Sequence, residues 1–332
     1  MKFIRIILLP IVPIYYIVTW MRNWLYDRGF KSSKSYDLPI ICVGNLSTGG
    51  TGKTPMIEYL IRLLNEKKSV ATLSRGYKRI TKGFVLGDEK ATADSIGDEP
   101  FQFLRKFEKI KVAVDENRQN GIEQLMLLND KPDLILLDDA YQHRKVRAGF
   151  NILLTSFNNL YYKDIVLPTG NLREPRSGAK RADVVVVTKC PKDISTIMKE
   201  RIASSIKLKP KQQLFFSYID YAEKVISKYN HLVLNELPKF TLVTGIANAK
   251  PLVDFLTNKG LSFDHIEFTD HYSFRLNDIE LLSEKELIIT TEKDYVRLSS
   301  HESLEKTLYY LPIRLKLDNS SNFNNSINTY VN

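Results

Sequence analysis

Short apolar runs recur along the first two thirds of the chain, and most of them end in polar residues. Unbroken runs, rather than alternating ones, are typical of strands buried on both faces, as in a parallel sheet covered by helices. In such sheets ligands bind beyond the carboxyl ends of the strands, where these polar residues fall. We therefore predict an α/β fold with a mostly parallel sheet. The runs lie at 39–43, 70–73, 111–114, 134–137, 152–154 and 184–187.

The composition changes after residue 205. Residues 206–235 are rich in Lys, Tyr and Ser and are interpreted as an inter-domain connection, and a second set of apolar runs begins at Phe240. Residues 319–332 are rich in Asn and Ser, which suggests a flexible tail. The predicted divisions are an N-terminal helix (1–30), a core domain (31–205), the connection (206–235), a smaller α/β domain (236–318) and the tail (319–332).

The N-terminal segment is uncharged from Ile6 to Trp20, with basic residues on both sides. As a helix it would span about 22 Å, short of the roughly 30 Å hydrocarbon core, and Pro10 and Pro13 would kink it. A signal peptide would need a small-residue cleavage site, and none follows Trp20. Interfacial aromatic residues favour a helix that lies in the membrane surface, with a buried core helix as the alternative.

A glycine-rich turn separates the first apolar run from a helical stretch that begins near Pro55. Its glycines let backbone N–H groups point at an anion, Lys53 can reach a β/γ-phosphate, and Thr54 can offer its hydroxyl to magnesium. Ser47 replaces the first glycine of the usual G-x-x-x-x-G-K-[ST] pattern, and an ordinary turn with an exposed lysine is the alternative. The predicted nucleotide-binding loop comprises Thr48, Gly49, Gly50, Thr51, Gly52, Lys53, Thr54 and Pro55.

The net charge of +10 and the pI of about 9.3 favour an anionic partner: a nucleotide, a nucleic acid, a phospholipid headgroup or a phosphorylated substrate. Cys42 and Cys190 are too few for a disulfide framework or a zinc site. Both are expected to be buried thiols in a reducing cytosol.

Acidic residues in three places could carry chemistry. Asp138 and Asp139 close an apolar run, as the magnesium-binding acid of a nucleotide site does, although a helix cap is the alternative. Asp98, in a Gly-Asp-Glu-Pro motif, could act on a proton or merely cap a helix. Asp270 and His271 form a carboxylate–histidine pair that could also serve as a base.

Several arginines follow strand ends, where bidentate contacts to phosphate are possible. Surface ion pairs are the alternative for each of them. They are Arg75, Arg118, Arg173 and Arg176.

The ordered motifs together resemble the tetraacyldisaccharide 4'-kinase (lipid A 4'-kinase) family, from the N-terminal segment to about Leu298. Ser47 is itself typical of that family, whereas Ala140 stands where it often has glycine. The motifs that carry the resemblance are Val43-Gly44-Asn45-Leu46-Ser47, Gly49-Gly50-Thr51-Gly52-Lys53-Thr54-Pro55, Ser74-Arg75-Gly76-Tyr77, Gly97-Asp98-Glu99-Pro100, Asp138-Asp139, Gln142-His143-Arg144, Leu172-Arg173-Glu174-Pro175, Asp270-His271 and Thr290-Thr291-Glu292-Lys293-Asp294.

The resemblance implies a P-loop NTPase-like core that uses ATP and Mg2+ to phosphorylate the 4'-hydroxyl of a tetraacyldisaccharide 1-phosphate, a lipid A precursor, at the cytoplasmic face of the inner membrane. It implies that Asp98, His271 and Lys53 are catalytic and that Thr54, Asp138 and Asp139 hold the metal. The expected substrate-binding residues are Arg75, Asn117, Arg118, His143, Arg144, Asn171 and Arg173.

Two functions from other classes compete with this interpretation. A membrane-associated ATPase switch would usually carry a second lysine early in the phosphate loop, and Ser47 and Thr48 offer none. A nucleic-acid-binding protein would explain the basic charge but not the apolar N-terminus, and no such motif is present, so no nucleic-acid partner is expected.

Overall fold

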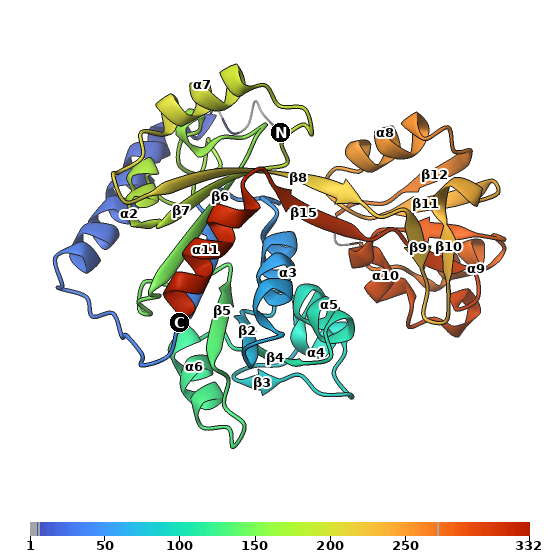
Figure 1. Cartoon of the computed structure of the whole chain (residues 1–332), viewed down its shortest axis with the longest axis horizontal. Coiled ribbons are helices and arrows are strands. Elements are labelled where there is room, and N and C mark those ends of the chain that lie inside the picture. The colour runs from blue at the N-terminus through green and yellow to red at the C-terminus, as the bar shows by residue number, and fades with distance from the viewer. Residues whose placement is uncertain (1–4, 6, 271) are drawn as a thin grey trace.

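Two sheets, each covered by helices, lie side by side in the computed structural model (Figure 1). The structure describes residue 5, residues 7–270 and residues 272–332. The larger sheet carries most of the predicted motifs and the smaller one is built mainly from residues 224–310.

The larger sheet contains, within the described residues, nine strands in the order β15-β8-β7-β6-β1-β5-β2-β4-β3. All neighbouring strands from β8 to β4 are parallel, while β15 and β3 pair antiparallel at the two edges. The mostly parallel sheet predicted from the apolar runs is therefore confirmed. Its strands are β1 (Ile40–Asn45), β2 (Val70–Ser74), β3 (Val85–Leu86), β4 (Ile110–Val114), β5 (Leu134–Asp138), β6 (Phe150–Ser156), β7 (Val184–Thr188), β8 (Gln213–Tyr221) and β15 (Ile313–Leu317).

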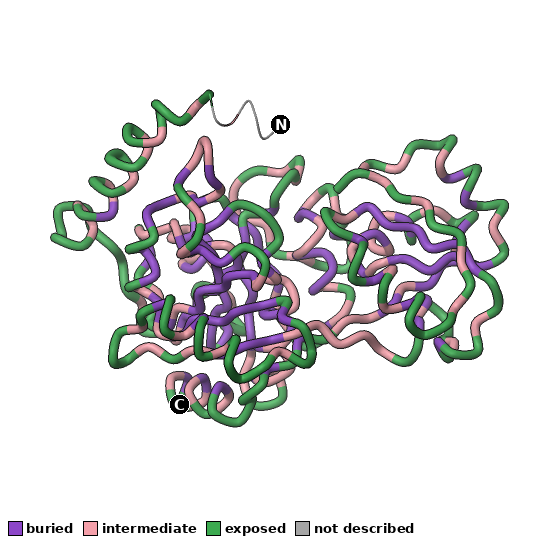
Figure 2. Tube along the Cα trace, turned by 90° about the horizontal axis from the view of Figure 1, so that it is seen from above, coloured by how far each residue is buried: buried purple, intermediate pink, exposed green. Residues whose placement is uncertain are grey.

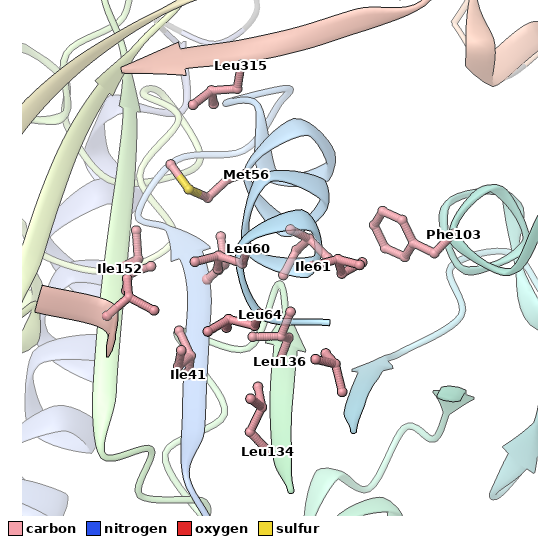
Figure 3. Packing of buried hydrophobic residues seen from close by; sticks show 14 of the residues in the cluster. Ile41, Met56, Leu60, Ile61, Leu64, Phe103, Leu134, Leu136, Ile152 and Leu315 are labelled. Atoms are coloured by element: carbon pink, nitrogen blue, oxygen red, sulfur yellow. The ribbon is translucent and has the colours of Figure 1, made fainter. Parts of the chain in front are cut away.

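Helices cover both faces of this sheet. In β1, Ile41 and Val43 belong to one apolar cluster, while Ile40 and Cys42 belong to the cluster on the other face. Figure 3 shows the first cluster, in which α3 lies between the strands and Phe103. Helices that contribute buried residues to the first cluster are α3 (Lys53–Leu64), α4 (Ala93–Ile96), α5 (Asp98–Lys106) and α11 (Ser320–Val331); those of the second are α6 (Arg118–Met126) and α7 (Thr196–Ile206).

The smaller sheet contains, among the residues described, six strands in the order β10-β9-β14-β13-β11-β12. Two clusters, one containing Leu242 and Leu256 and the other Val243 and Leu298, form its core. Its elements are β9 (Lys224–Ile226), β10 (His231–Val233), β11 (Phe240–Thr244), α8 (Lys250–Asn258), β12 (Phe263–Glu267), α9 (Leu276–Ser283), β13 (Ile288–Thr290), α10 (Glu292–Leu298) and β14 (Leu308–Tyr310).

Two predicted boundaries are wrong at this junction. The predicted connection 206–235 contains three strands, of which β8 belongs to the larger sheet and β9 and β10 to the smaller one. The predicted C-terminal domain ends too late, because β15 leaves the smaller sheet and pairs with β8. The antiparallel pair β8–β15 thus joins the two sheets (Figure 1).

The predicted flexible tail is also wrong, because these residues form α11. Phe323, Ile327 and Val331 recur at every fourth position, so they form one apolar stripe that is buried in the core of the larger sheet. The side chain of Asn319 accepts a hydrogen bond from the amide of Asn322 (3.4 Å) at the start of the helix. The Asn- and Ser-rich composition hid this stripe because only three residues in the segment carry it.

The N-terminal helix α2 (Val12–Asp27) lies at the margin of the larger unit with most of its residues exposed (Figure 2). Ile14, Ile17 and Val18 are 63%, 57% and 54% exposed, respectively. We predicted that Pro13 would kink the helix. It lies instead in the first turn of α2, where proline is tolerated, and does not kink it. Among the described helices, none combines the length and the apolar character that a membrane span requires.

Candidate active site

The predicted phosphate loop connects β1 to α3. Gly49 and Gly52 have φ values of +101° and +85°, a region that side chains with a Cβ rarely adopt. The side chain of Asn45, at the end of β1, donates to the hydroxyl of Thr51 (2.8 Å), and the amide of Thr48 donates to the carbonyl of Asn171 (2.8 Å). The loop is therefore held in shape from both sides, with its glycines where backbone N–H groups can surround an anion.

Lys53 begins α3 and points toward the carboxyl end of β5. Its Nζ lies 3.7 Å from Asp139, which also accepts hydrogen bonds from Arg173 (3.0 and 3.1 Å). Burial alone would raise the pKa of Asp139, but the charges of Lys53 and Arg173 outweigh it and lower that pKa. Asp139 is thus a carboxylate shared by two cations. Its φ of +49° shows that the turn into Ala140 is tight even without the expected glycine.

Asp138 has a different environment from its neighbour. It is 4% exposed, and its Oδ1 has no hydrogen-bond partner among the residues described. Burial, and then the charge of Glu99, raise the pKa of Asp138 to about 7. A buried carboxylate oxygen without a partner, beside a phosphate loop, fits a bound cation. No group of three or more His, Cys, Asp or Glu side chains gathers within the described ranges, so water and phosphate oxygens would complete the shell of an ion here.

Asp98 lies at the start of α5, and its partner comes from the smaller sheet. Its carboxylate accepts a hydrogen bond from Arg297 of α10, which also donates to the carbonyl of Tyr272 (3.3 Å). The φ of Gly97 is +94°, and a Cβ at this position would lie 3.2 Å from the backbone of Gly76. The Ser-Arg-Gly-Tyr and Gly-Asp-Glu-Pro motifs therefore touch.

His271, the predicted partner of Asp98, lies outside the described residues. Its neighbour Asp270 accepts a hydrogen bond from Lys293 (3.1 Å). Lys293 and Arg297 are one turn apart on α10, so this helix supplies cations to Asp270 and to Asp98. Sequence reasoning missed Arg297; the only available signal was its position four residues after a lysine in a motif already singled out.

A buried polar cluster, formed by Glu58, Gln102, Lys106 and Glu292, joins α3, α5 and α10. Lys106 donates to Glu58 (2.7 Å) and to Glu292 (2.5 Å), and Gln102 donates to the same two carboxylates (2.9 Å each). Glu58 is 2% exposed and Glu292 is 8% exposed. Burial first, and the charge of Glu58 second, raise the pKa of Glu292. These hydrogen bonds thus fix α3, which follows the phosphate loop, and α5, which begins at Asp98, to helix α10 of the smaller sheet.

Among the predicted substrate-binding residues, Arg118 and His143 lie close enough to Arg75 for their charges to interact. Arg118 is 2% exposed and donates to the carbonyls of Asp115 (2.5 Å) and Asp138 (3.4 Å), so its guanidinium supports strand ends. Asn117 precedes α6, with its amide bonded to Asp115 (2.8 Å). Arg75 is exposed. Burial, and then the charge of Arg118, lower the pKa of His143 to about 4.

The remaining predicted substrate contacts already have partners in the protein. Arg144 donates to the carbonyl of Asn23 (2.8 Å) and to Asp27 (2.6 Å), so it ties down α2. Asn171 donates to Asp164 (2.9 Å) and accepts from Arg5 (3.0 Å).

A buried carboxylate to which the sequence analysis assigned no role connects α2 to the phosphate loop. Glu174 is 1% exposed and accepts hydrogen bonds from Asn23 (2.5 Å), Gln142 (2.9 Å) and Arg181 (2.8 and 3.0 Å). Gln142 also donates to the carbonyl of Asn45, the last residue of β1 (2.8 Å). The exposed helix is thus linked through two side chains to the start of the loop.

Comparisons with known proteins agree on one family. The family model described as tetraacyldisaccharide-1-P 4'-kinase matches residues 4–332. A tetraacyldisaccharide 4'-kinase of Flavobacterium johnsoniae is 52% identical over 100% of this chain and 98% of the relative, and one of Bacteroides thetaiotaomicron is 44% identical over 98% and 92%. A crystal structure of LpxK from Aquifex aeolicus in complex with ATP superposes with a TM-score of 0.80 at 30% identity, covering 99% of this chain and 100% of that one.

The buried environment of His143 predicts that its imidazole ring is uncharged at and below neutral pH. We expect its ring to stay neutral from pH 8 to pH 5, because burial and Arg118 disfavour the imidazolium. Since the native pKa lies below the value of about 6.5 in an unfolded chain, this group contributes stability that is lost as the pH falls from about 6.5 to about 4. NMR titration of the histidine C–H signals, assigned with His143→Gln, would measure it. A midpoint near pH 6.5 would contradict the prediction.

Proposed function

Because the chain belongs to the tetraacyldisaccharide-1-P 4'-kinase family, we propose that it transfers the γ-phosphate of ATP to the 4'-hydroxyl of a tetraacyldisaccharide 1-phosphate. The product is the 1,4'-bisphosphorylated lipid A precursor. The proposal is supported most strongly by the phosphate loop, which follows β1, and by the contact of Lys53 with the Asp138–Asp139 pair at the end of the neighbouring strand β5. In the reaction the 4'-oxygen bonds to the γ-phosphorus, and the bond from that phosphorus to the bridging oxygen breaks. ADP leaves with the electron pair.

Charge neutralisation comes mainly from the loop. Its backbone N–H groups and the start of α3 face the phosphates, and Lys53 reaches the β/γ-phosphates once its contact with Asp139 loosens. Thr54 and Asp138, with Asp139 beside them, would hold Mg2+, which neutralises charge on the β- and γ-phosphates when bound. The unpartnered oxygen of Asp138 supports this assignment for Asp138 more strongly than for Asp139, which two cations already share.

Asp98 is the proposed acceptor of the hydroxyl proton. Arg297 donates a hydrogen bond to this carboxylate and holds it at the start of α5, where it could accept the proton of an acceptor hydroxyl. Glu99, the next residue, is close enough for its charge to raise the pKa of Asp138, so α5 begins near the metal-binding end of β5. We also propose that His271 orients Asp98, and the sequence motif Asp270-His271 is the only support for this role.

The acylated acceptor is proposed to approach from a membrane surface, at the cytoplasmic face of the inner membrane. The exposed apolar residues of α2 provide the surface that would enter the lipid headgroup region. Arg75, one of the predicted phosphate contacts, is exposed, so a ligand could reach it. Asn117, Arg118, His143, Arg144, Asn171 and Arg173 are proposed to shape the same region, mostly through the contacts described above.

Asp98→Ala is expected to lower phosphoryl transfer by about 100- to 10,000-fold, the range for loss of a general base, while ATP binding survives. Lys53→Ala should abolish transfer as well. The assay combines purified protein, labelled ATP, magnesium and the acceptor in mixed micelles, with nucleotide affinity measured separately.

Asp94→Ala, at an exposed acidic residue in the nearby helix α4, is the matched control and should keep wild-type activity. Equal loss of ATP binding and turnover in Asp98→Ala would contradict the role. ATP hydrolysis that needs no acceptor would favour the ATPase switch.

Ile14→Glu and Ile17→Glu are expected to weaken binding to anionic vesicles by roughly tenfold or more, since each removes an apolar side chain from the proposed membrane surface. Co-sedimentation with phosphatidylglycerol-containing vesicles would measure it. Ile197→Glu, at a 79% exposed isoleucine of α7, is the control and should bind normally. If all three variants bind like the wild type, α2 is not the membrane contact.

A further inference from the structure

The carboxyl end of β7 lies against the phosphate loop, although β6 separates β7 from β1 in the sheet. The hydroxyl of Thr188, the last residue of β7, donates to the carbonyl of Thr51 (2.7 Å). A Cβ at Gly52 would lie 3.7 Å from the side chain of Thr188. The residue that follows Thr188 is therefore held next to the loop by a buried hydrogen bond.

That residue is Lys189, and its ammonium reaches the loop. A Cβ built on Gly50 would lie 3.7 Å from Nζ of Lys189. The φ of Lys189 is +57°, a left-handed conformation that is uncommon for a residue other than glycine, asparagine or aspartate. Such backbone conformations often occur at ligand-binding positions. The residue also keeps an exposed face, so a ligand in the loop can reach it.

Among the described residues, no opposite charge lies beside the ammonium group of Lys189. Within the described ranges, no carboxylate and no hydrogen-bond acceptor contacts its Nζ, whereas Lys53 has Asp139 at 3.7 Å. Burial first, and repulsion from Lys53 second, lower the pKa of Lys189. The ammonium groups of Lys53 and Lys189 thus lie at the same loop. Of the two, only Lys53 has a carboxylate nearby, and that carboxylate, Asp139, is shared with Arg173. This excess of positive charge favours a bound anion.

We propose that Lys189 is a second phosphate-binding lysine of the ATP site, supplied by β7 rather than by the loop itself. Its ammonium contacts the phosphate chain of the bound nucleotide from the side of Gly50, while Lys53 approaches from the start of α3. The inference rests on the proposed function only in taking ATP as the nucleotide. It also shows how a loop without a lysine at Ser47 or Thr48 gains a second cation from a distant strand.

Lys189 is a binding residue in this account, so its loss should affect affinity more than turnover. Lys189→Met keeps the apolar stem and removes the charge. We expect it to raise the Kd of both ATP and ADP by about 10- to 100-fold, the range for a charged hydrogen bond. The kcat at saturating ATP and the KM of the acceptor should change little. Lys189→Arg should recover most of the affinity because it restores a cation.

The test measures nucleotide Kd by calorimetry for wild type, Lys189→Met, Lys189→Arg and the control Lys192→Met, together with the melting temperature of each nucleotide-free protein. Lys192 is 76% exposed at its side chain and lies 3.7 Å from Asp220, so its variant should bind like the wild type. An unchanged Kd for Lys189→Met would overturn the proposal. So would a weaker Kd accompanied by a lower melting temperature and no recovery in Lys189→Arg, since that pattern indicates a structural role.

The two proposals fail in different ways. If the wild-type protein binds ATP but phosphorylates no acceptor, the proposed function fails and the role of Lys189 is still decided by the Kd values. If the wild type phosphorylates the acceptor and Lys189→Met binds nucleotide normally, only the role of Lys189 fails.

Discussion

Two buried carboxylates, Glu58 and Glu292, share Lys106 and Gln102 at the junction of three helices, and the geometry of the site depends on this contact. It fixes the helix that begins at Lys53 to the helix that begins at Asp98, and both to the smaller sheet. Glu292 also accepts a hydrogen bond from the amide of Ile313, at the start of β15 (3.1 Å). Since breaking a buried charged network leaves a carboxylate unpaired, a shift of the smaller sheet is costly unless the whole cluster moves together.

A second contact, centred on Glu174, relates the exposed helix α2 to the same site. Asn23 binds Glu174, and Gln142 joins Glu174 to the end of β1, directly before the phosphate loop. The proposed acceptor carries acyl chains, so its apolar part would lie in lipid while its hydroxyl lies at the γ-phosphate of ATP. If α2 is the membrane contact, its short, hydrogen-bonded connection to the loop would keep these two places at a set separation, which favours positioning as the main contribution to catalysis.

The sequence predicted what is encoded locally and missed what depends on distant pairing. Unbroken apolar runs identified the parallel sheet, and the Gly-Lys-Thr pattern identified the loop, because each depends on neighbouring residues. The pairing of Asp98 with Arg297 and the approach of Lys189 to Gly50 join segments far apart in the chain, so no local pattern shows them. Helix α11 was missed because its apolar stripe is diluted by Asn and Ser, and β15 because its return to the larger sheet is set by pairing with β8.

Identifying the reaction product would decide whether the protein is a 4'-kinase. Purified protein is incubated with ATP, magnesium and tetraacyldisaccharide 1-phosphate in mixed micelles, and the lipid is analysed by mass spectrometry and by phosphorus NMR. We expect the acceptor to gain one phosphate as a new phosphomonoester at the 4'-oxygen, with one ADP formed for each product molecule. Release of ADP and inorganic phosphate with the lipid unchanged, or a phosphate at another hydroxyl, would contradict it.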